Sequence, residues 1–191
     1  MSRLLKADAR RMLAPLLSFL AFSCLGVAVA VAANGPGTPY CFSNSDCPCG
    51  NVDPTAGCAN STGAGALLSS SGSASASADD LVLTVSNVPP NQFGILFMGG
   101  SQVVDRIPFG DGLLCVSSVP GVFCRFLVQN SGSSGVMTEG PGIVAFSQTL
   151  QPACHIDPGD TWYFQGWYRD PQGPCGGLFN LSNAVSVTFA P

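Results

Sequence analysis

The chain contains very few basic residues and few charges of any kind. Charged residues make up 9% of its 191 positions, and its one lysine, Lys6, lies near the N-terminus. From Asn34 onward there are three arginines against ten acidic residues, a net charge of about −7. Such a chain repels phosphate backbones and offers no polybasic patch to anionic lipid. We therefore expect no nucleic-acid partner and no attachment to membrane surfaces.

Histidine and glutamate, which commonly perform acid–base catalysis, occur once each, and the aspartates lie at predicted turns, where Asp is expected anyway. The one histidine, His155, could be combined with Asp157 and a serine, but no G-x-S-x-G elbow accompanies it. A glycosidase needs two carboxylates across a cleft, whereas the one glutamate, Glu139, lies in a glycine-flanked stretch. The sequence predicts that the protein is not an enzyme, with a hydrolase as a distant alternative.

Metal-binding motifs are also scarce. Asp157, Asp160, Asp170 and the acidic turn "GDG" at 110–112 could supply oxygen ligands to calcium. No D-x-D-x-D-G run is present, and aspartate is common in turns for its own reasons. We expect no metal and no cofactor, and calcium is the minor alternative.

The first 33 residues have the pattern of a signal peptide. Four basic residues precede an uncharged run rich in Leu, Ala and Val at 12–33, which ends in the small residues Val31, Ala32 and Ala33. We expect export to the periplasm, cell envelope or medium, with the mature chain starting near Ala33 or Asn34. The run is also long enough to be an uncleaved signal anchor, and a lipid-modified Cys24 is a weaker third reading.

Eight cysteines remain after this leader. They are Cys41, Cys47, Cys49, Cys58, Cys115, Cys124, Cys154 and Cys175. An even number in an exported chain indicates four disulfides, whose connectivity does not follow from the residues. Zinc is the competing interpretation for the first four, but the C-x-C spacing at 47–49 does not match the usual spacing of a structural site.

Apolar residues alternate with a period of two along most of the mature chain. Leu81, Leu83 and Val85 form one such set, Val185, Val187 and Phe189 another, and Gly and Pro interrupt the runs regularly. We predict one immunoglobulin-like β-sandwich over 65–191, preceded by a disulfide-stapled cap at 34–64. The Ser/Ala/Gly stretch at 69–78 suits either a linker or an edge strand. The predicted core is Leu81, Leu83, Val85, Phe93, Ile95, Phe97, Val122, Phe126, Trp162, Phe164, Val185, Val187 and Phe189.

The most distinctive stretch is "DPGDTWYFQGWYRDPQGPC" at 157–175. Its beginning, "IDPGDTWYF" at 156–164, is similar to the corner before strand F of fibronectin type III domains. Trp162 and Phe164 share one face of the predicted strand, and the opposite face carries Tyr163, Gln165, Trp167 and Arg169. We expect Gln165, Trp167 and Arg169 to point outward, with Arg169 over the Trp167 ring as a cation–π pair. This face could bind a glycan or a protein, or could support the 34–64 cap, which we favour slightly.

Five segments together resemble a secreted β-domain of unassigned function from planctomycete- or myxobacterial-type bacteria, often found C-terminal to propeller-type repeats. They are "CPCGN", "GCANSTGAGALL", "DDLVLTVSNVPPNQFGILFMG", "PFGDGLLCV" and "FQGWYRDPQGPCGGLFNLSNAVSVTF", spanning 47–189. The resemblance implies an exported, disulfide-bonded accessory module and assigns no catalytic residue. It further implies that Cys124 pairs with Cys154 and Cys115 with Cys175. Two bonds then remain among Cys41, Cys47, Cys49 and Cys58.

Two classes of function therefore remain. One is an exported, non-catalytic module that binds a glycan or an envelope protein through aromatic side chains such as Trp167 and Tyr163. The other is a purely structural envelope protein. A solvent-facing Trp167 favours binding, and a buried one favours structure.

Overall fold

The computed structural model describes residues 35–118 and 123–191, and most of its ordered elements are β-strands. The predicted signal peptide, residues 1–33, lies outside the described residues. These strands are β1 (Thr38–Tyr40), β2 (Leu67–Ser71), β3 (Val82–Ser86), β4 (Phe93–Gly99), β5 (Ser101–Phe109), β6 (Gly112–Ser117), β7 (Cys124–Arg125), β8 (Gln129–Asn130), β9 (Met137–Glu139), β10 (Thr161–Arg169) and β11 (Phe179–Thr188). A short helix α1 (Ile143–Ser147) and a 3₁₀ turn η1 (Pro152–Cys154) complete the described elements. Neither of these helical segments has the length to cross a membrane.

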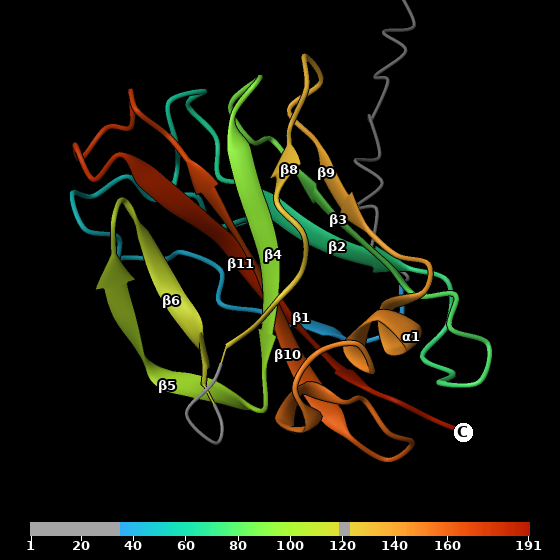
Figure 1. The fold of residues 1–191 in the computed structure, drawn as a ribbon. Helices are drawn as coiled ribbons and strands as arrows, with labels where there is room; N and C mark the ends of the chain where they lie inside the picture. Colours follow the sequence, from blue (N-terminus) through green and yellow to red (C-terminus); the bar gives the residue numbers. More distant parts are fainter. Residues whose placement is uncertain (1–34, 119–122) are drawn as a thin grey trace, which may run out of the picture. The chain divides into compact units, whose positions relative to one another are not determined.

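The strands form three antiparallel sheets, as Figure 1 shows. The large sheet has the order β1-β11-β10-β4-β7, and β8 also pairs with β4. A second sheet has the order β2-β3-β9, and β5 and β6 form a separate hairpin. The all-β prediction is confirmed, and so is the edge-strand interpretation of residues 69–71, because β2 pairs with β3 alone. The immunoglobulin-like arrangement stays a prediction.

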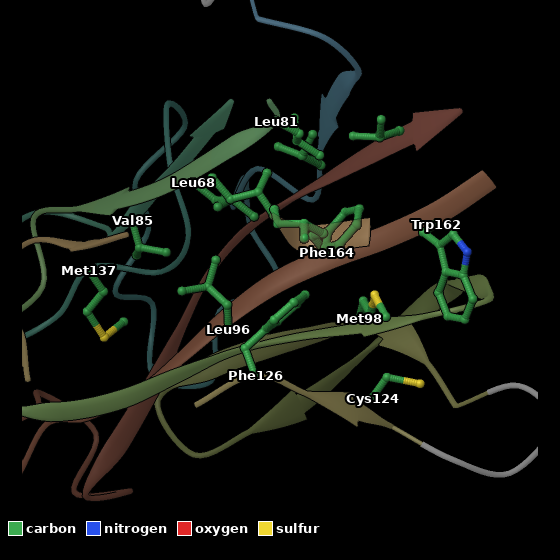
Figure 2. Packing of buried hydrophobic residues seen from close by; sticks show 14 of the residues in the cluster. Leu68, Leu81, Val85, Leu96, Met98, Cys124, Phe126, Met137, Trp162 and Phe164 are labelled. Carbon is green, nitrogen blue, oxygen red and sulfur yellow. The ribbon is translucent and has the colours of Figure 1, made fainter. Parts of the chain in front are cut away.

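The main hydrophobic core lies between the large sheet and the β2-β3-β9 sheet (Figure 2). Both sheets present alternate residues to it, because successive side chains of a strand point to opposite faces. Leu83 and Val85 of β3 are fully buried, as are Phe164 of β10 and Val187 of β11. The alternation in these strands was therefore assigned to the correct face.

The assignment of β4 was wrong in part. Leu96 and Met98 point into the main core, whereas Phe97 belongs to a second apolar cluster on the opposite face of the sheet. Ile95 also faces that side and is only half-buried, and Phe93 is 55% exposed at the start of the strand. The run "FGILFM" is apolar at every position because both faces of β4 are covered, so it has no period from which to choose a face. Val122, also predicted for the core, lies outside the described residues.

The second face of the large sheet is covered by two elements: the cap, as favoured from the sequence, and the β5–β6 hairpin, which was not predicted. The β5–β6 hairpin and the cap pack on it, and their residues share the second cluster with Phe97, Leu181 and Ala184. From the hairpin come Leu113, Cys115 and Val116, and from the cap Cys41, Cys47 and Cys58. The predicted single sandwich thus carries an additional third layer.

One amide side chain joins the edge strand β2 of the second sheet to β11 of the large sheet. Asn183 of β11 accepts a hydrogen bond from the Leu68 N–H at 2.7 Å and donates one to the Leu68 carbonyl at 3.1 Å. The Asn183 amide thus forms the two hydrogen bonds that the backbone of a neighbouring strand would form with Leu68, because it offers both a donor and an acceptor. The buried edge of β2 is thereby satisfied without a further strand.

The four disulfides are Cys41–Cys115, Cys47–Cys58, Cys49–Cys175 and Cys124–Cys154. The predicted Cys124–Cys154 bond is confirmed, and so is one bond within the cap, Cys47–Cys58. The predicted Cys115–Cys175 bond is wrong. The cap lies across the domain, so Cys41 faces β6 while Cys49 faces the segment that follows β10.

The pairing can be checked with trypsin, because arginines 106, 125 and 169 provide the tryptic sites after position 34. Digestion of the unreduced, denatured protein should leave 34–106 joined to 107–125 and to 170–191, with 126–169 joined to 107–125. Mass spectrometry should therefore find one cross-linked complex that separates only on reduction. Release of the peptide ending at Arg106 before reduction would restore the pairing implied by the sequence.

Leu83→Ala should test the main core. The side chain is fully buried, so its truncation should lower the free energy of unfolding by about 2–5 kcal/mol. Val104→Ala is the control, because Val104 is 84% exposed on β5, and it should cost less than about 1 kcal/mol. Guanidinium unfolding of both variants measures the difference. Equal losses would contradict the assigned faces.

Candidate functional site

The second face of the large sheet contains a pocket of about 640 Å³. Its position follows from the hairpin, which covers only part of the apolar surface of β4, β10 and β11. Its lining consists of eight apolar residues and one arginine: Ile95, Phe97, Phe109, Leu114, Phe123, Arg125, Trp167, Phe179 and Leu181. Small-molecule sites have volumes of about 300–1,000 Å³ and similar apolar linings.

Five aromatic rings line this pocket, and they pack in two separate groups. The Trp167 ring centroid lies 5.6 Å from that of Phe179, and the Phe109 ring centroid lies 4.8 Å from that of Phe179. Phe97 and Phe123 form a further edge-to-face pair at 5.6 Å. Such pairs favour fixed orientations, so the rings form a largely preset surface.

The hairpin turn fixes the position of Phe179. Gly110, at φ 60°, lies so close that a Cβ there would be 2.5 Å from a ring carbon of Phe179. Only glycine accommodates both this dihedral angle and this contact. The glycine of the "GDG" turn therefore has a structural role in the wall of the pocket.

Arg125 is the charged residue of the lining. It lies on β7 opposite Phe97 of β4, and its side chain is exposed. Over residues 35–118 and 123–191 the structure contains one salt bridge, between Arg106 and Asp46 at 3.0 Å. Arg125 thus has no carboxylate partner among the described residues.

The four residues predicted as a binding face do not form one surface. Trp167 is half-buried and lines the pocket, and Tyr163 packs edge-to-face against Tyr40 of the cap at 6.0 Å. Arg169 is exposed and does not line the pocket. The ring of Trp167 packs against the ring of Phe179, and not under the guanidinium of Arg169 as the predicted cation–π pair required. The cap therefore covers the Tyr163 end of the face, and the pocket occupies the Trp167 end.

Gln165 was predicted to point outward and is fully buried instead. Its amide nitrogen donates to the carbonyls of Leu113 and Ser182, both at 2.8 Å. Its amide oxygen accepts from the Cys115 N–H at 3.1 Å. The side chain thus joins β10 to β6 and β11, which explains why a polar residue occupies a covered face.

Sequence reasoning missed Arg125, Phe123, Phe109 and Phe179 as site residues. A signal existed for the first two. Phe123 and Arg125 alternate with Cys124 and Phe126, which belong to the main core, so they must point to the opposite face. Phe109 and Phe179 had no such signal. They contact each other because the β5–β6 hairpin folds onto β11, and that tertiary contact has no pattern in the sequence.

A second group of buried polar residues lies beneath the cap. Asp111 of the "GDG" turn accepts hydrogen bonds from the N–H groups of Cys175 and Gly177, and Asp170 accepts one from Ser61 at 3.0 Å. Both side chains are fully buried and adjacent, since a Cβ at Gly173 would lie 2.1 Å from Asp111 Oδ2 and 2.9 Å from Asp170 Oδ2. These carboxylates therefore hold the cap and the segment after β10 together.

Buried hydrogen bonds also hold Asn60 of the cap in place. Its amide donates to the Asn87 carbonyl at 2.7 Å and to the Tyr168 hydroxyl at 3.1 Å. Burial raises the pKa of Tyr168 above its ordinary value, so this hydroxyl stays neutral. The cap is thus ordered by buried hydrogen bonds as well as by disulfides.

The other candidates for chemistry lie apart from the pocket. His155 follows η1, and its Nε2 lies 3.3 Å from the Leu150 carbonyl. Burial raises the pKa of Glu139, although the Gln129 amide donates to this carboxylate at 2.9 Å. Asp160 accepts the Asp157 N–H at 2.9 Å. In the part of the chain that the structure describes, no three His, Cys, Asp or Glu side chains converge as a metal site would require.

The fold and the pocket together define a disulfide-stapled all-β domain with an aromatic cavity beside its hairpin. Comparison of the chain with protein-family models, curated proteins and solved structures finds no match to any of them. The site itself is therefore the basis for assigning a function.

Gln165→Leu should reveal how strongly the third layer depends on one amide. The change leaves two carbonyls and one N–H buried without partners, so the free energy of unfolding should fall by about 2–4 kcal/mol. Gln102→Leu is the matched control, because Gln102 is exposed on β5, and it should change stability by less than about 0.5 kcal/mol. Thermal unfolding followed by near-UV circular dichroism measures both. A neutral Gln165→Leu would refute the role assigned to this amide.

Proposed function

We propose that the chain is an exported, non-catalytic binding module of the cell envelope or extracellular space that takes up a small apolar ligand in its aromatic pocket. The observation that carries this proposal is the pocket of about 640 Å³, whose lining has eight apolar residues out of nine. An empty apolar surface of this kind costs free energy in water, and a ligand that covers it gains that free energy.

Export is supported by the disulfides. Four disulfide bonds require an oxidising environment, which most cytosols do not provide. The basic and apolar pattern of residues 1–33 supplies the route in this proposal. The family suggested by the sequence motifs is exported as well, and our proposal agrees with that resemblance.

A glycan is a weaker candidate for this pocket than an apolar ligand. Sugar rings stack on exposed aromatic faces, but their hydroxyl groups also need hydrogen-bonding partners. The lining offers two side-chain donor groups, the guanidinium of Arg125 and the indole N–H of Trp167, and no side-chain acceptor. The site is therefore better suited to a ligand with few hydroxyl groups.

A purely structural role remains the alternative for Trp167, and one specific observation favours it. The Trp167 ring already packs on Phe179, so part of its surface is used within the domain. The two roles can be told apart by removing the Trp167 ring. If Trp167 binds the ligand, its removal weakens the affinity for that ligand, whereas a purely structural role changes only the stability of the domain.

The uncharged fluorophore N-phenyl-1-naphthylamine provides the test. It should bind the folded protein with enhanced fluorescence, and Trp167→Ala should weaken this binding at least tenfold, because a large part of the wall is removed. Phe93→Ala is the control, since Phe93 is an exposed aromatic residue outside the pocket lining. It should leave the dissociation constant unchanged.

Two results would contradict the proposed function. One is the absence of binding to the folded wild-type protein. The other is equal binding to wild type and Trp167→Ala together with a lowered melting temperature of the variant, which would give Trp167 a structural role alone.

A further inference from the structure

The positive charge of Arg125 at the pocket indicates which chemical group the otherwise apolar ligand carries. Arg125 is one of nine lining residues and the charged one among them. Its backbone is fixed by pairing with Phe97 on β4 and by the Cys124–Cys154 disulfide next to it. The arginine is therefore carried on a paired strand beside the aromatic wall rather than on a free loop.

The state of Arg125 differs from that of Arg106. Arg106 donates to Asp46 at 3.0 Å and to the Phe42 carbonyl at 2.7 Å, so its charge serves the contact between hairpin and cap. Arg125 has no carboxylate partner among the described residues, in a chain whose part beyond position 33 has ten acidic residues for three arginines. Acidic side chains are thus plentiful, yet none of those described pairs with this arginine.

An arginine beside an apolar wall is well suited to an anion. The guanidinium stays charged at any physiological pH and offers a planar fork of donors that matches a carboxylate or sulfonate. The interaction is stronger next to a low-dielectric surface than in open water. The aromatic pairs Phe97–Phe123 and Phe109–Phe179 at the same time present ring faces and edges to a planar body.

We propose that the ligand is a small organic anion whose planar apolar ring system fills the aromatic pocket while its carboxylate or sulfonate group binds Arg125. This inference rests on the proposed function, and it adds the chemical class of the ligand. The negative net charge of the chain repels anions at long range. Selectivity for the anion therefore depends on the local charge of Arg125.

A matched pair of fluorophores tests the proposal. N-Phenyl-1-naphthylamine and 8-anilino-1-naphthalenesulfonate share their rings and differ in the sulfonate, so their comparison isolates the anionic group. For wild type, both should bind at the same site and displace each other. For Arg125→Gln, the dissociation constant of the sulfonate should rise about fivefold to tenfold, equivalent to about 1–1.4 kcal/mol, while that of the neutral fluorophore stays the same.

Arg169→Gln is the matched control. It removes the same charge from an exposed residue that does not line the pocket, so it should leave both dissociation constants unchanged within about twofold. Near-UV circular dichroism should confirm that both variants keep the wild-type fold, because 8-anilino-1-naphthalenesulfonate also binds partly folded chains.

The outcomes separate this inference from the function on which it rests. Equal weakening of sulfonate binding by Arg125→Gln and Arg169→Gln, or no weakening by either, would overturn the role of Arg125. Binding of the neutral fluorophore that depends on Trp167 would then still support the pocket. Failure of both fluorophores to bind wild type would overturn the proposed function, and the anionic ligand class with it.

Discussion

The structure depends on one constraint, which is that both faces of the β4-β10-β11 sheet are apolar. A sheet with one apolar face needs one covering layer, whereas this sheet needs two. The β2-β3-β9 sheet covers the first face and forms the main core. The hairpin and the cap share the second face, and the part that neither covers is the aromatic pocket. The candidate site is thus a direct consequence of incomplete coverage.

Buried polar side chains attach the hairpin and the cap to the second face of the large sheet. Gln165 links the hairpin to the sheet, and Asp111 links the hairpin turn to the segment after β10. Asp170 and Asn60 bind the cap to the domain, through the Ser61 N–H and through Asn87 and Tyr168 respectively. Each is fully or almost fully buried and forms at least one hydrogen bond, which offsets part of the desolvation cost of a buried polar group. Such bonds have strict geometry, and they specify one position of the cap where apolar contacts alone would allow several. A segment with few apolar residues is ordered in this way.

The sequence predicted strands well where one face of the sheet differs from the other. The alternation of Leu83 and Val85, and that of Val185 and Val187, named the buried residues correctly. The alternation failed to identify the buried residues at Phe93 and Ile95. The run in β4 is apolar on both faces, so it has no two-residue period that would distinguish one face from the other. Disulfide pairing failed for Cys115 for another reason: partners far apart in the chain are set by the tertiary position of the cap, which no local pattern encodes. The site prediction had the same limits. Trp167 lines the pocket but its binding role stays a prediction, Gln165 is buried rather than outward, and Arg125 was missed although its alternation with Phe126 was visible.

The Cys49–Cys175 bond also constrains the order of events while the chain is made. Synthesis proceeds from the N-terminus, so Cys49 appears 126 residues before its partner. During that interval Cys41 and Cys58, which belong to other bonds, are both much closer to Cys49 in sequence than Cys175 is. An early bond between Cys49 and Cys58 would leave Cys47 unable to take its native partner until a thiolate attacks and exchanges the bond. A chain that forms such a bond needs thiol–disulfide exchange late in folding, and a compartment with an isomerase would return it to the native pairing faster than one that merely oxidises.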